Sequence, residues 1–340
     1  MLTPSSARTA SAANAKSPVL PREVQPHLAE FERFFSSQVD TFEPHLRELV
    51  RYIFVNQGKR IRPTLVFCSG WTDNGRIVPD QVYAAAVVEL IHLATLVHDD
   101  VLDNASLRHQ LPTVSYKFGP SVAVLLGDAL LTQALKIASE SLSIEVCRAM
   151  ASATRRVCAG EIHQTLERGN PRFSINEYFE VISMKTGELF AVSCLLGARV
   201  AGHPEEFVDA ASRFGLQLGI AYQLFDDLAD FCGDEDKIGK TLGTDLASGK
   251  FTLPLLYLIE RLPENEAAAM RQDVLAGTAN VKNLAEQMNK HGVLASVRER
   301  FETELRLGTD ALARWDGLPA TARLLDLATY VRAQVARLLD

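Results

Sequence analysis

Apolar residues recur at three- and four-residue intervals along nearly the whole chain from Pro26 onward. This spacing places them on one face of an α-helix, and it is clearest over residues 81–105 and 175–201. No run of strict alternation between apolar and polar residues is bounded by hairpin turns, so we expect hardly any β-sheet. No internal repeat or Pro/Gly-rich linker divides the pattern. The sequence therefore predicts an all-α fold made of a single large helical bundle.

The first 22 residues differ in composition from the rest of the chain. They are rich in Ala, Ser and Thr, contain three basic residues and have no acidic ones, which is typical of a disordered tail and also of an organelle transit peptide. We expect residues 1–22 to be a disordered tail and residues 23–340 to form the folded domain. Within that domain, Asp80 is expected to precede a helix, and Ser174 with Glu177 matches a capping box.

Composition and charge argue against several classes of protein. A net charge of −7 makes nucleic acid or an anionic membrane an unsuitable main partner. The most apolar stretch, residues 84–97, is interrupted by Glu89 and His92, so we expect no membrane span. Five scattered cysteines without a C-x-x-C pair indicate a reducing compartment, and we predict a cytoplasmic location.

Two segments carry the same acidic motif, D-D-x-x-D. The six aspartates are Asp99, Asp100, Asp103, Asp226, Asp227 and Asp230. The 19 aspartates of the chain would produce such a motif by chance about 0.06 times in 340 residues. On a helix, the first and last aspartate of each motif lie on one face, where like charges repel each other. Because carboxylate oxygens together with substrate phosphates suit Mg²⁺, we predict that both motifs bind Mg²⁺.

Residues that suit a phosphate group accompany these motifs. They are Lys59 and Arg62 in the segment GKRIRP, His92 seven residues before the first motif, Arg108, Lys185, Thr186, Gln223, Lys240 and Lys250. The segment 233–250 contains four glycines and three lysines, and we expect it to form a lid that closes over phosphate. No Walker A loop or strand-to-helix G-x-G-x-x-G segment occurs, so a nucleotide cofactor is not indicated.

Together these segments resemble the trans-polyprenyl diphosphate synthases, and within them the octaprenyl- and solanesyl-like long-chain branch. The resemblance covers about residues 45 to 260 in ordered blocks: GKRIRP (58–63), ELIHLATLVHDDVLD (89–103), LRHQLPT (107–113), LLGDALL (125–131), GEIHQ (160–164), KTGELF (185–190), YQLFDDLAD (222–230) and GTDLASGKFTLPLL (243–256). It implies the isoprenoid synthase fold, in which a helical bundle surrounds a deep central cavity, and a homodimer.

The resemblance also implies roles for individual residues. The aspartates of both motifs would bind Mg²⁺, and the catalytic residues would be Asp99, Asp103, Lys185, Asp226 and Asp230. Isopentenyl diphosphate would be bound by Lys59, Arg62, His92 and His109. The allylic diphosphate would be bound by Arg108, Lys185, Thr186, Gln223, Lys240 and Lys250. The family usually has Arg where this chain has His109, so we expect weaker and more pH-dependent binding of isopentenyl diphosphate.

The implied reaction is a prenyl transfer. Mg²⁺ assists ionisation of the allylic carbon–oxygen bond, the double bond of isopentenyl diphosphate attacks the cation, and a proton leaves. Successive additions give an all-trans polyprenyl diphosphate. Ala94 and Thr95 are small where short-chain relatives carry an aromatic residue at the cavity floor, so we predict a medium- to long-chain product. Leu131 and Leu135 on the next helix are candidates for the floor.

Three alternative functions stay open. A short-chain farnesyl or geranylgeranyl diphosphate synthase would use the same motifs. A non-catalytic subunit of a heteromeric synthase would typically lose acidic motifs, whereas this chain keeps both. A class I terpene cyclase shares the metal-assisted ionisation, but it needs no site for a second diphosphate and usually has a mixed second motif.

Overall fold

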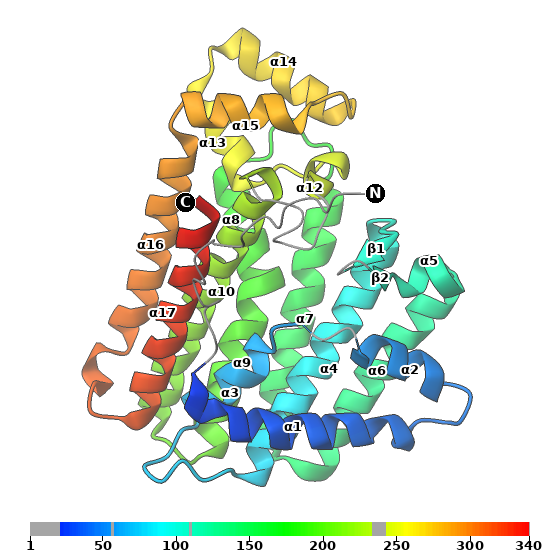
Figure 1. Ribbon diagram of the computed structural model, residues 1–340, viewed down its shortest axis with the longest axis vertical. Helices are drawn as coiled ribbons and strands as arrows, with labels where there is room; N and C mark the ends of the chain where they lie inside the picture. The colour runs from blue at the N-terminus through cyan, green and yellow to red at the C-terminus, as the bar shows by residue number, and fades with distance from the viewer. Residues whose placement is uncertain (1–20, 56–57, 109–110, 233–242, 340) are drawn as a thin grey trace, which may run out of the picture.

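The computed structural model describes residues 21–55, 58–108, 111–232 and 243–339, and this part of the chain is almost entirely helical (Figure 1). The long helices are α1 (Gln25–Ser37), α2 (Arg47–Val55), α3 (Ile61–Ser69), α4 (Pro79–Leu102), α6 (Pro120–Ser141), α7 (Ile144–Leu166), α8 (Ile175–Ile182), α9 (Glu188–Val200), α10 (Glu205–Cys232), α13 (Leu253–Arg261), α14 (Glu264–Leu275), α15 (Val281–Lys290), α16 (Val293–Ala311) and α17 (Pro319–Leu339). The predicted all-α fold is confirmed.

Short elements connect these helices. They are the 3₁₀-helices η1 (Arg22–Val24), η2 (Gln38–Thr41) and η4 (Ala313–Trp315), the π-helical segment η3 (Ser183–Gly187), the helices α5 (Val114–Phe118) and α12 (Thr244–Ala247), and the strands β1 (Leu107–Arg108) and β2 (Leu111–Pro112). The strands pair antiparallel, with Leu107 opposite Pro112. The predicted tail, residues 1–22, lies outside the described residues except for its last two, since Arg22 begins η1.

Local side-chain chemistry explains where two of the helices begin. At α8, the Ser174 hydroxyl accepts a hydrogen bond from the Glu177 amide, and the Glu177 carboxylate accepts one from the Ser174 amide at 2.7 Å. The predicted capping box is therefore confirmed. The expectation that Asp80 precedes a helix is wrong, because Pro79 occupies the first helical position of α4 and Asp80 lies inside the first turn. Proline is favoured there since its φ angle is already helical.

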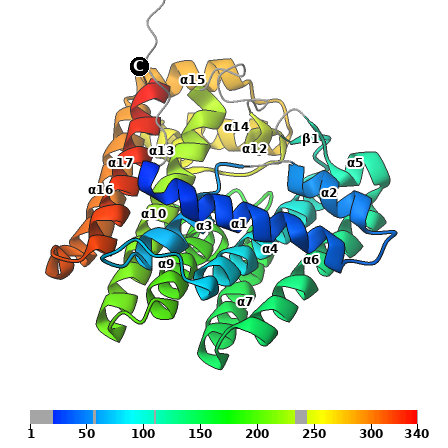
Figure 2. The ribbon, with the colours of Figure 1, turned by 60° about the horizontal axis from the view of Figure 1, so that its bottom comes forward.

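Most of these helices, among them α4, α6, α7, α10 and α16, run side by side along the long axis of the molecule (Figure 1). Helix α10 packs on α9 and α16, and α4 packs on α6, α9 and α3. Helix α1 crosses the lower end of this bundle, and α14 and α15 cross the upper end; Figure 2 shows α1 from a second direction. The ends of α4 and α10, which carry the two acidic motifs, lie at the upper end of the bundle, near β1 and α12.

Three helical stretches are long and apolar enough to cross a membrane by length and composition: Pro79–Leu102, Pro120–Ser141 and Ile175–Val200. In the first and third, 72% and 67% of the apolar window is buried inside the protein, whereas only 39% is buried in the second. The apolar side chains of α4 and of the α8–α9 stretch are thus largely buried in the core of the bundle. Helix α6 instead exposes apolar side chains, among them Leu125 and Leu135.

Candidate active site

Both acidic motifs lie at the carboxyl end of a helix. Asp99 and Asp100 belong to the last turn of α4, Asp103 caps that helix, and the second motif lies in the last two turns of α10. The carboxyl end of a helix already carries a partial negative charge, so these carboxylates depend on cations nearby. Arg108 interacts electrostatically with Asp99, Asp100 and Asp226, which indicates that acids of the two helices face a common space.

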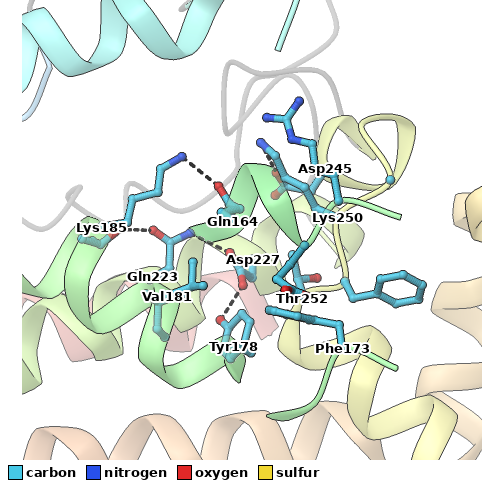
Figure 3. A pocket seen from close by; sticks show the side chains of 16 residues that line it. Gln164, Phe173, Tyr178, Val181, Lys185, Gln223, Asp227, Asp245, Lys250 and Thr252 are labelled. Atoms are coloured by element: carbon cyan, nitrogen blue, oxygen red, sulfur yellow. Dashed lines mark hydrogen bonds and ion pairs between the residues drawn. The ribbon is translucent and has the colours of Figure 1, made fainter. Parts of the chain in front are cut away.

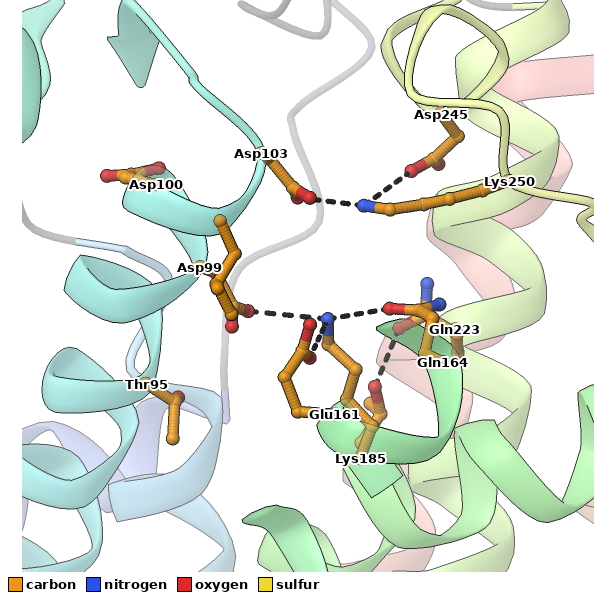
Figure 4. Close-up of polar contacts among 12 residues, drawn as sticks. Thr95, Asp99, Asp100, Asp103, Glu161, Gln164, Lys185, Gln223, Asp245 and Lys250 are labelled. Atoms are coloured by element: carbon orange, nitrogen blue, oxygen red, sulfur yellow. Dashed lines mark hydrogen bonds and ion pairs between the residues drawn. The ribbon is translucent and has the colours of Figure 1, made fainter. Parts of the chain in front are cut away.

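The three aspartates of the first motif have different partners. Asp103 accepts a hydrogen bond from Lys250 Nζ at 2.8 Å on one oxygen and pairs with Arg168 through the other. Asp99 Oδ2 lies 3.5 Å from Lys185 Nζ. In Figure 4, Asp99 and Asp103 point from the end of α4 toward Lys185 and Lys250, which belong to other segments of the chain.

Asp100 is directed away from Asp99 and Asp103 (Figure 4). It is buried, and one of its oxygens accepts hydrogen bonds from Arg108 Nε at 3.0 Å and Nη2 at 2.7 Å. Asp100 therefore does not share the orientation of Asp99 and Asp103, which point toward Lys185 and Lys250. The guanidinium predicted to bind the allylic diphosphate is held by this carboxylate.

Lys185 is the cation at the centre of the site. Its ammonium group donates to Gln164 Oε1 at 2.9 Å and pairs with Glu161 and Asp99. It belongs to η3, a π-helical interruption of the α8–α9 stretch, and such interruptions are frequent at functional sites. A Cβ atom on Gly160 would lie 2.8 Å from the Lys185 amide nitrogen. Only glycine at that position lets α7 approach the π-helical segment so closely.

The second motif is anchored by a hydrogen-bonded chain (Figure 3). Thr186 Oγ1 donates to Gln223 Oε1 at 2.7 Å, and Gln223 Nε2 donates to Asp227 Oδ1 at 2.7 Å. The Tyr178 hydroxyl donates to the other oxygen of Asp227 at 2.5 Å. Buried Asp230 accepts a hydrogen bond from the Asp245 amide at 3.2 Å. These contacts fix the orientation of the last two turns of α10.

The pKa values of the acids differ because their surroundings differ. Burial raises the pKa of Asp99 to about 6, although the charge of Lys185 opposes the shift. Burial also raises the pKa of Asp227 to about 7, helped by the nearby charge of Asp245. For Asp103, burial is outweighed by Lys250 and Arg168, which hold its pKa below the usual range. The site therefore contains carboxylates that an additional cation would stabilise in the charged form.

The residues predicted to bind isopentenyl diphosphate lie around α3 and α4. The Arg62 guanidinium stacks 5.0 Å from the Phe190 ring centre, and its buried Nε has no hydrogen-bond partner among the described residues. Burial lowers the pKa of Arg62. Lys59 Nζ lies 5.9 Å from the Phe225 ring centre. His92 lines a pocket that also includes Arg108.

Arg60 stands between these two cations in the sequence, yet its role is structural. It adopts a left-handed conformation with φ of 50° at the start of α3. Its buried guanidinium pairs with Glu32 of α1 at 2.7 Å and with Glu89 of α4 at 2.6 Å. The GKRIRP segment is therefore attached to two neighbouring helices through Arg60.

The residues predicted to control chain length lie below the first motif. Thr95 is one turn below Asp99 on α4 (Figure 4), and its hydroxyl donates to the His92 carbonyl at 2.8 Å. Ala94 is buried in the core. The suggestion that Leu135 contributes to the cavity floor is wrong for a single chain, because this side chain is 52% exposed on α6.

Two predicted site residues, His109 and Lys240, lie outside the described residues, as does most of the segment 233–250 expected to form a lid. Five residues of the site were not singled out from the sequence: Glu161, Gln164, Arg168, Tyr178 and Asp245. Glu161 and Gln164 belong to the segment GEIHQ, and Asp245 belongs to GTDLASGK. Both segments are among the blocks that resemble the family, and this membership could have pointed to the three residues. Arg168 and Tyr178 belong to no such block.

The side chains fit a divalent cation that is shared with a substrate. Within the described ranges, no three His, Cys, Asp or Glu side chains converge closely enough to hold a metal by themselves. Asp99 and Asp103 nevertheless present carboxylates from one helix face toward Lys185 and Lys250. Mg²⁺ typically binds through one or two carboxylates plus substrate phosphates and water. The donor set therefore suits Mg²⁺ that arrives with a diphosphate.

Comparison with known proteins gives consistent results. The model of the polyprenyl synthetase family matches residues 43–290. The octaprenyl diphosphate synthase of Haemophilus influenzae is 32% identical over 289 residues, covering 84% of this chain and 88% of that protein. Component 2 of the heptaprenyl diphosphate synthase of Geobacillus stearothermophilus is 34% identical over 312 residues, covering 89% and 94%. A polyprenyl synthase from Caulobacter crescentus CB15, solved with calcium and isoprenyl diphosphate, superimposes with a TM-score of 0.84 at 29% identity, covering 93% and 98%.

Proposed function

Since the chain belongs to the polyprenyl synthetase family, we infer that it is a prenyltransferase that makes a medium- to long-chain polyprenyl diphosphate. Relatives named octaprenyl and nonaprenyl diphosphate synthase support that product class. The observation that carries the inference is that the first acidic motif meets Lys185 and Lys250 at one end of the bundle, where Arg108 interacts with acids of both motifs. An excess of carboxylates beside such cations suits a metal-bound diphosphate.

We propose the following roles for the residues around the diphosphates. Lys185, Lys250, Thr186 and Gln223 line one pocket and would bind the allylic diphosphate, with Arg108 and Lys240 completing the set. Lys59, Arg62, His92 and His109 would bind isopentenyl diphosphate. The orphan Nε of Arg62 supports this assignment, because a buried donor without a partner favours an incoming acceptor.

Asp99, Asp103, Asp226 and Asp230 would hold Mg²⁺. Asp100 and Asp227 would assist by orienting Arg108 and Gln223, to which they are hydrogen-bonded. When bound, Mg²⁺ supplies the positive charge that stabilises the leaving diphosphate. A calcium ion in the related structure from Caulobacter crescentus is consistent with a divalent cation in this family.

The reaction follows from this arrangement. Lys185 and Lys250 hold the diphosphate while the allylic carbon–oxygen bond breaks, and the electron pair of that bond stays with the diphosphate. The double bond of isopentenyl diphosphate then attacks the allylic cation and forms the new carbon–carbon bond. The proton released from the adjacent carbon passes to the departing diphosphate. Apolar faces of the surrounding helices exclude water from the cation.

We propose that the product extends along α4 past Thr95 and Ala94. Neither side chain is large enough to block a cavity at that level, and both lie toward the amino end of α4 from Asp99. This supports a chain longer than that of farnesyl or geranylgeranyl diphosphate.

We also propose a cytoplasmic homodimer that forms through α6 and α7. Leu125 on α6 and Ile162 and Leu166 on α7 are 68%, 60% and 76% exposed. Helices α6 and α7 are in contact, and large exposed apolar side chains on adjacent helices are typical of a protein–protein interface.

The test is to incubate the purified protein alone with farnesyl diphosphate, isopentenyl diphosphate and Mg²⁺ and to resolve the products by chain length. We expect a ladder that ends in one dominant medium- or long-chain polyprenyl diphosphate and that is abolished by a chelator. A single addition would contradict the chain-length proposal. No turnover without a second protein would instead support the role of a subunit in a heteromeric synthase. One relative is itself named component 2 of a heptaprenyl diphosphate synthase.

A further inference from the structure

Arg168 lies two residues beyond the end of α7 and outside every motif of the sequence. Its Nη2 pairs with Asp103 Oδ1, and its Nη1 donates to the Leu102 carbonyl at 3.2 Å. The side chain is thus fixed beside the first acidic motif, and its buried Nε donor has no hydrogen-bond partner among the described residues.

The two oxygens of Asp103 are both occupied by cations. Arg168 pairs with Oδ1, and Lys250 donates to Oδ2 at 2.8 Å. If Asp103 is a metal ligand, as in the proposed function, a divalent cation replaces these partners at the carboxylate. Lys250 would keep Asp245, 3.6 Å away, but Arg168 would keep only the Leu102 carbonyl. A largely buried positive charge without an anion is strongly unfavourable.

The pocket beside Arg168 offers that anion a place. Arg168 lines it together with Lys185 and Lys250, which come from η3 and from the segment before α13. Three acidic residues, Glu167, Asp227 and Asp245, line the same pocket, and each has a partner. Glu167 accepts a hydrogen bond from Asn170 at 2.5 Å, Asp227 accepts hydrogen bonds from Tyr178 and Gln223, and Asp245 lies 3.6 Å from Lys250. Lys185 likewise keeps Glu161, so Arg168 is the cation of this pocket that most needs an anion once a metal ion occupies Asp103.

We propose that Arg168 is a further diphosphate-binding residue of this enzyme. It covers Asp103 before substrate arrives, and it contacts the allylic diphosphate, and then the released pyrophosphate, once a metal ion occupies Asp103. The unused Nε and the adjacent Nη2 form the planar pair of donors that binds two phosphate oxygens at once. This proposal rests on the proposed function and adds a residue to its diphosphate site.

Because Arg168 competes with metal but assists diphosphate, its removal should have opposite effects on the two ligands. Binding of inorganic pyrophosphate in saturating Mg²⁺ is measured by titration calorimetry, and binding of Mn²⁺ alone is measured from the electron paramagnetic resonance of the free ion. In Arg168→Gln, we expect pyrophosphate to bind about 10- to 100-fold more weakly, as for the loss of a charged hydrogen bond. Mn²⁺ alone should bind about fivefold more tightly.

Two further variants keep the outcome interpretable. Arg172→Gln removes the same charge from an exposed position four residues away, and we expect it to change both affinities less than twofold. Arg168→Lys keeps the charge without the planar fork, so an intermediate loss of pyrophosphate affinity is expected even if the Gln variant folds poorly. Unchanged pyrophosphate binding in both Arg168 variants, or equal losses at positions 168 and 172, would overturn the proposal. Failure of the unaltered protein to bind pyrophosphate with Mg²⁺ would overturn the proposed function itself.

Discussion

The ion pairs of Arg60 allow a quantitative prediction about stability and substrate binding together. Replacing Glu89 by Gln keeps the shape of the side chain but removes the charge that lies 2.6 Å from Arg60. The side chains of Arg60 and Glu89 are only 8% and 5% exposed. Removing one partner of such a buried pair typically costs 3–5 kcal/mol, because the other charge is left uncompensated.

For Glu89→Gln we expect a loss near the lower end of that range, about 3 kcal/mol. Arg60 keeps its second partner, Glu32, whose side chain is more exposed. Equilibrium unfolding in urea, followed by circular dichroism, measures the change in unfolding free energy. The matched control is Glu140→Gln, which breaks the exposed pair with Lys136 on α6 and should cost less than about 0.5 kcal/mol.

The same variant should affect the binding of isopentenyl diphosphate. Arg60 holds a left-handed backbone position next to Lys59 and two residues before Arg62, so releasing its guanidinium should make the positions of both cations less fixed. We expect the KM for isopentenyl diphosphate to rise while kcat at saturation changes little. The double variant Arg60→Met, Glu89→Leu should be less destabilised than Glu89→Gln, because it leaves no buried guanidinium at position 60 without its partner. A cost below 1 kcal/mol for Glu89→Gln, or equal costs for Glu89→Gln and Glu140→Gln, would refute the reasoning.

Three further changes have definite expected results. Thr95→Phe should shorten the dominant product of the synthase, as resolved by chain length, and an unchanged product distribution would count against growth of the chain along α4. Burial lowers the pKa of His27, so the folded protein resists a proton that the unfolded chain accepts below pH ~6.5. The unfolding free energy should therefore fall from pH 7 to pH 5 more steeply than in His27→Phe, and parallel pH profiles would exclude that role. Leu125→Arg should convert a dimer into monomers in sedimentation velocity, whereas an unchanged dimer would place the interface elsewhere.

The helical fold and the helix faces of the motifs could be predicted from the sequence because both depend on local spacing. The four-residue interval between Asp99 and Asp103 is sufficient to place them on one face, and the structure shows them facing Lys185 and Lys250. The capping box at Ser174 is equally local. The start of α4 differs by two residues from the expected one, because Asp80 suits a position before a helix as well as its first turn.

The partners of these motif residues depend on contacts between distant segments, which local patterns do not encode. Arg168 meets Asp103 across 65 positions of sequence, and Tyr178 meets Asp227 across 49. Likewise, nothing in the GKRIRP segment distinguishes Arg60, which is bound to Glu89, from its neighbours. The π-helical segment that presents Lys185 also escaped prediction, since one added residue in a helical turn leaves the apolar pattern nearly unchanged.

The central claim is that the carboxylates of both motifs act together on one metal-bound diphosphate. The most direct measurement compares the rate of diphosphate release from farnesyl diphosphate and isopentenyl diphosphate in Asp99→Asn, Asp226→Asn and the control Asp209→Asn, an exposed position on α10. We expect kcat to fall at least about 100-fold in each motif variant and to stay within twofold in the control. Near-normal kcat in either motif variant, with product still elongating, would contradict the claim.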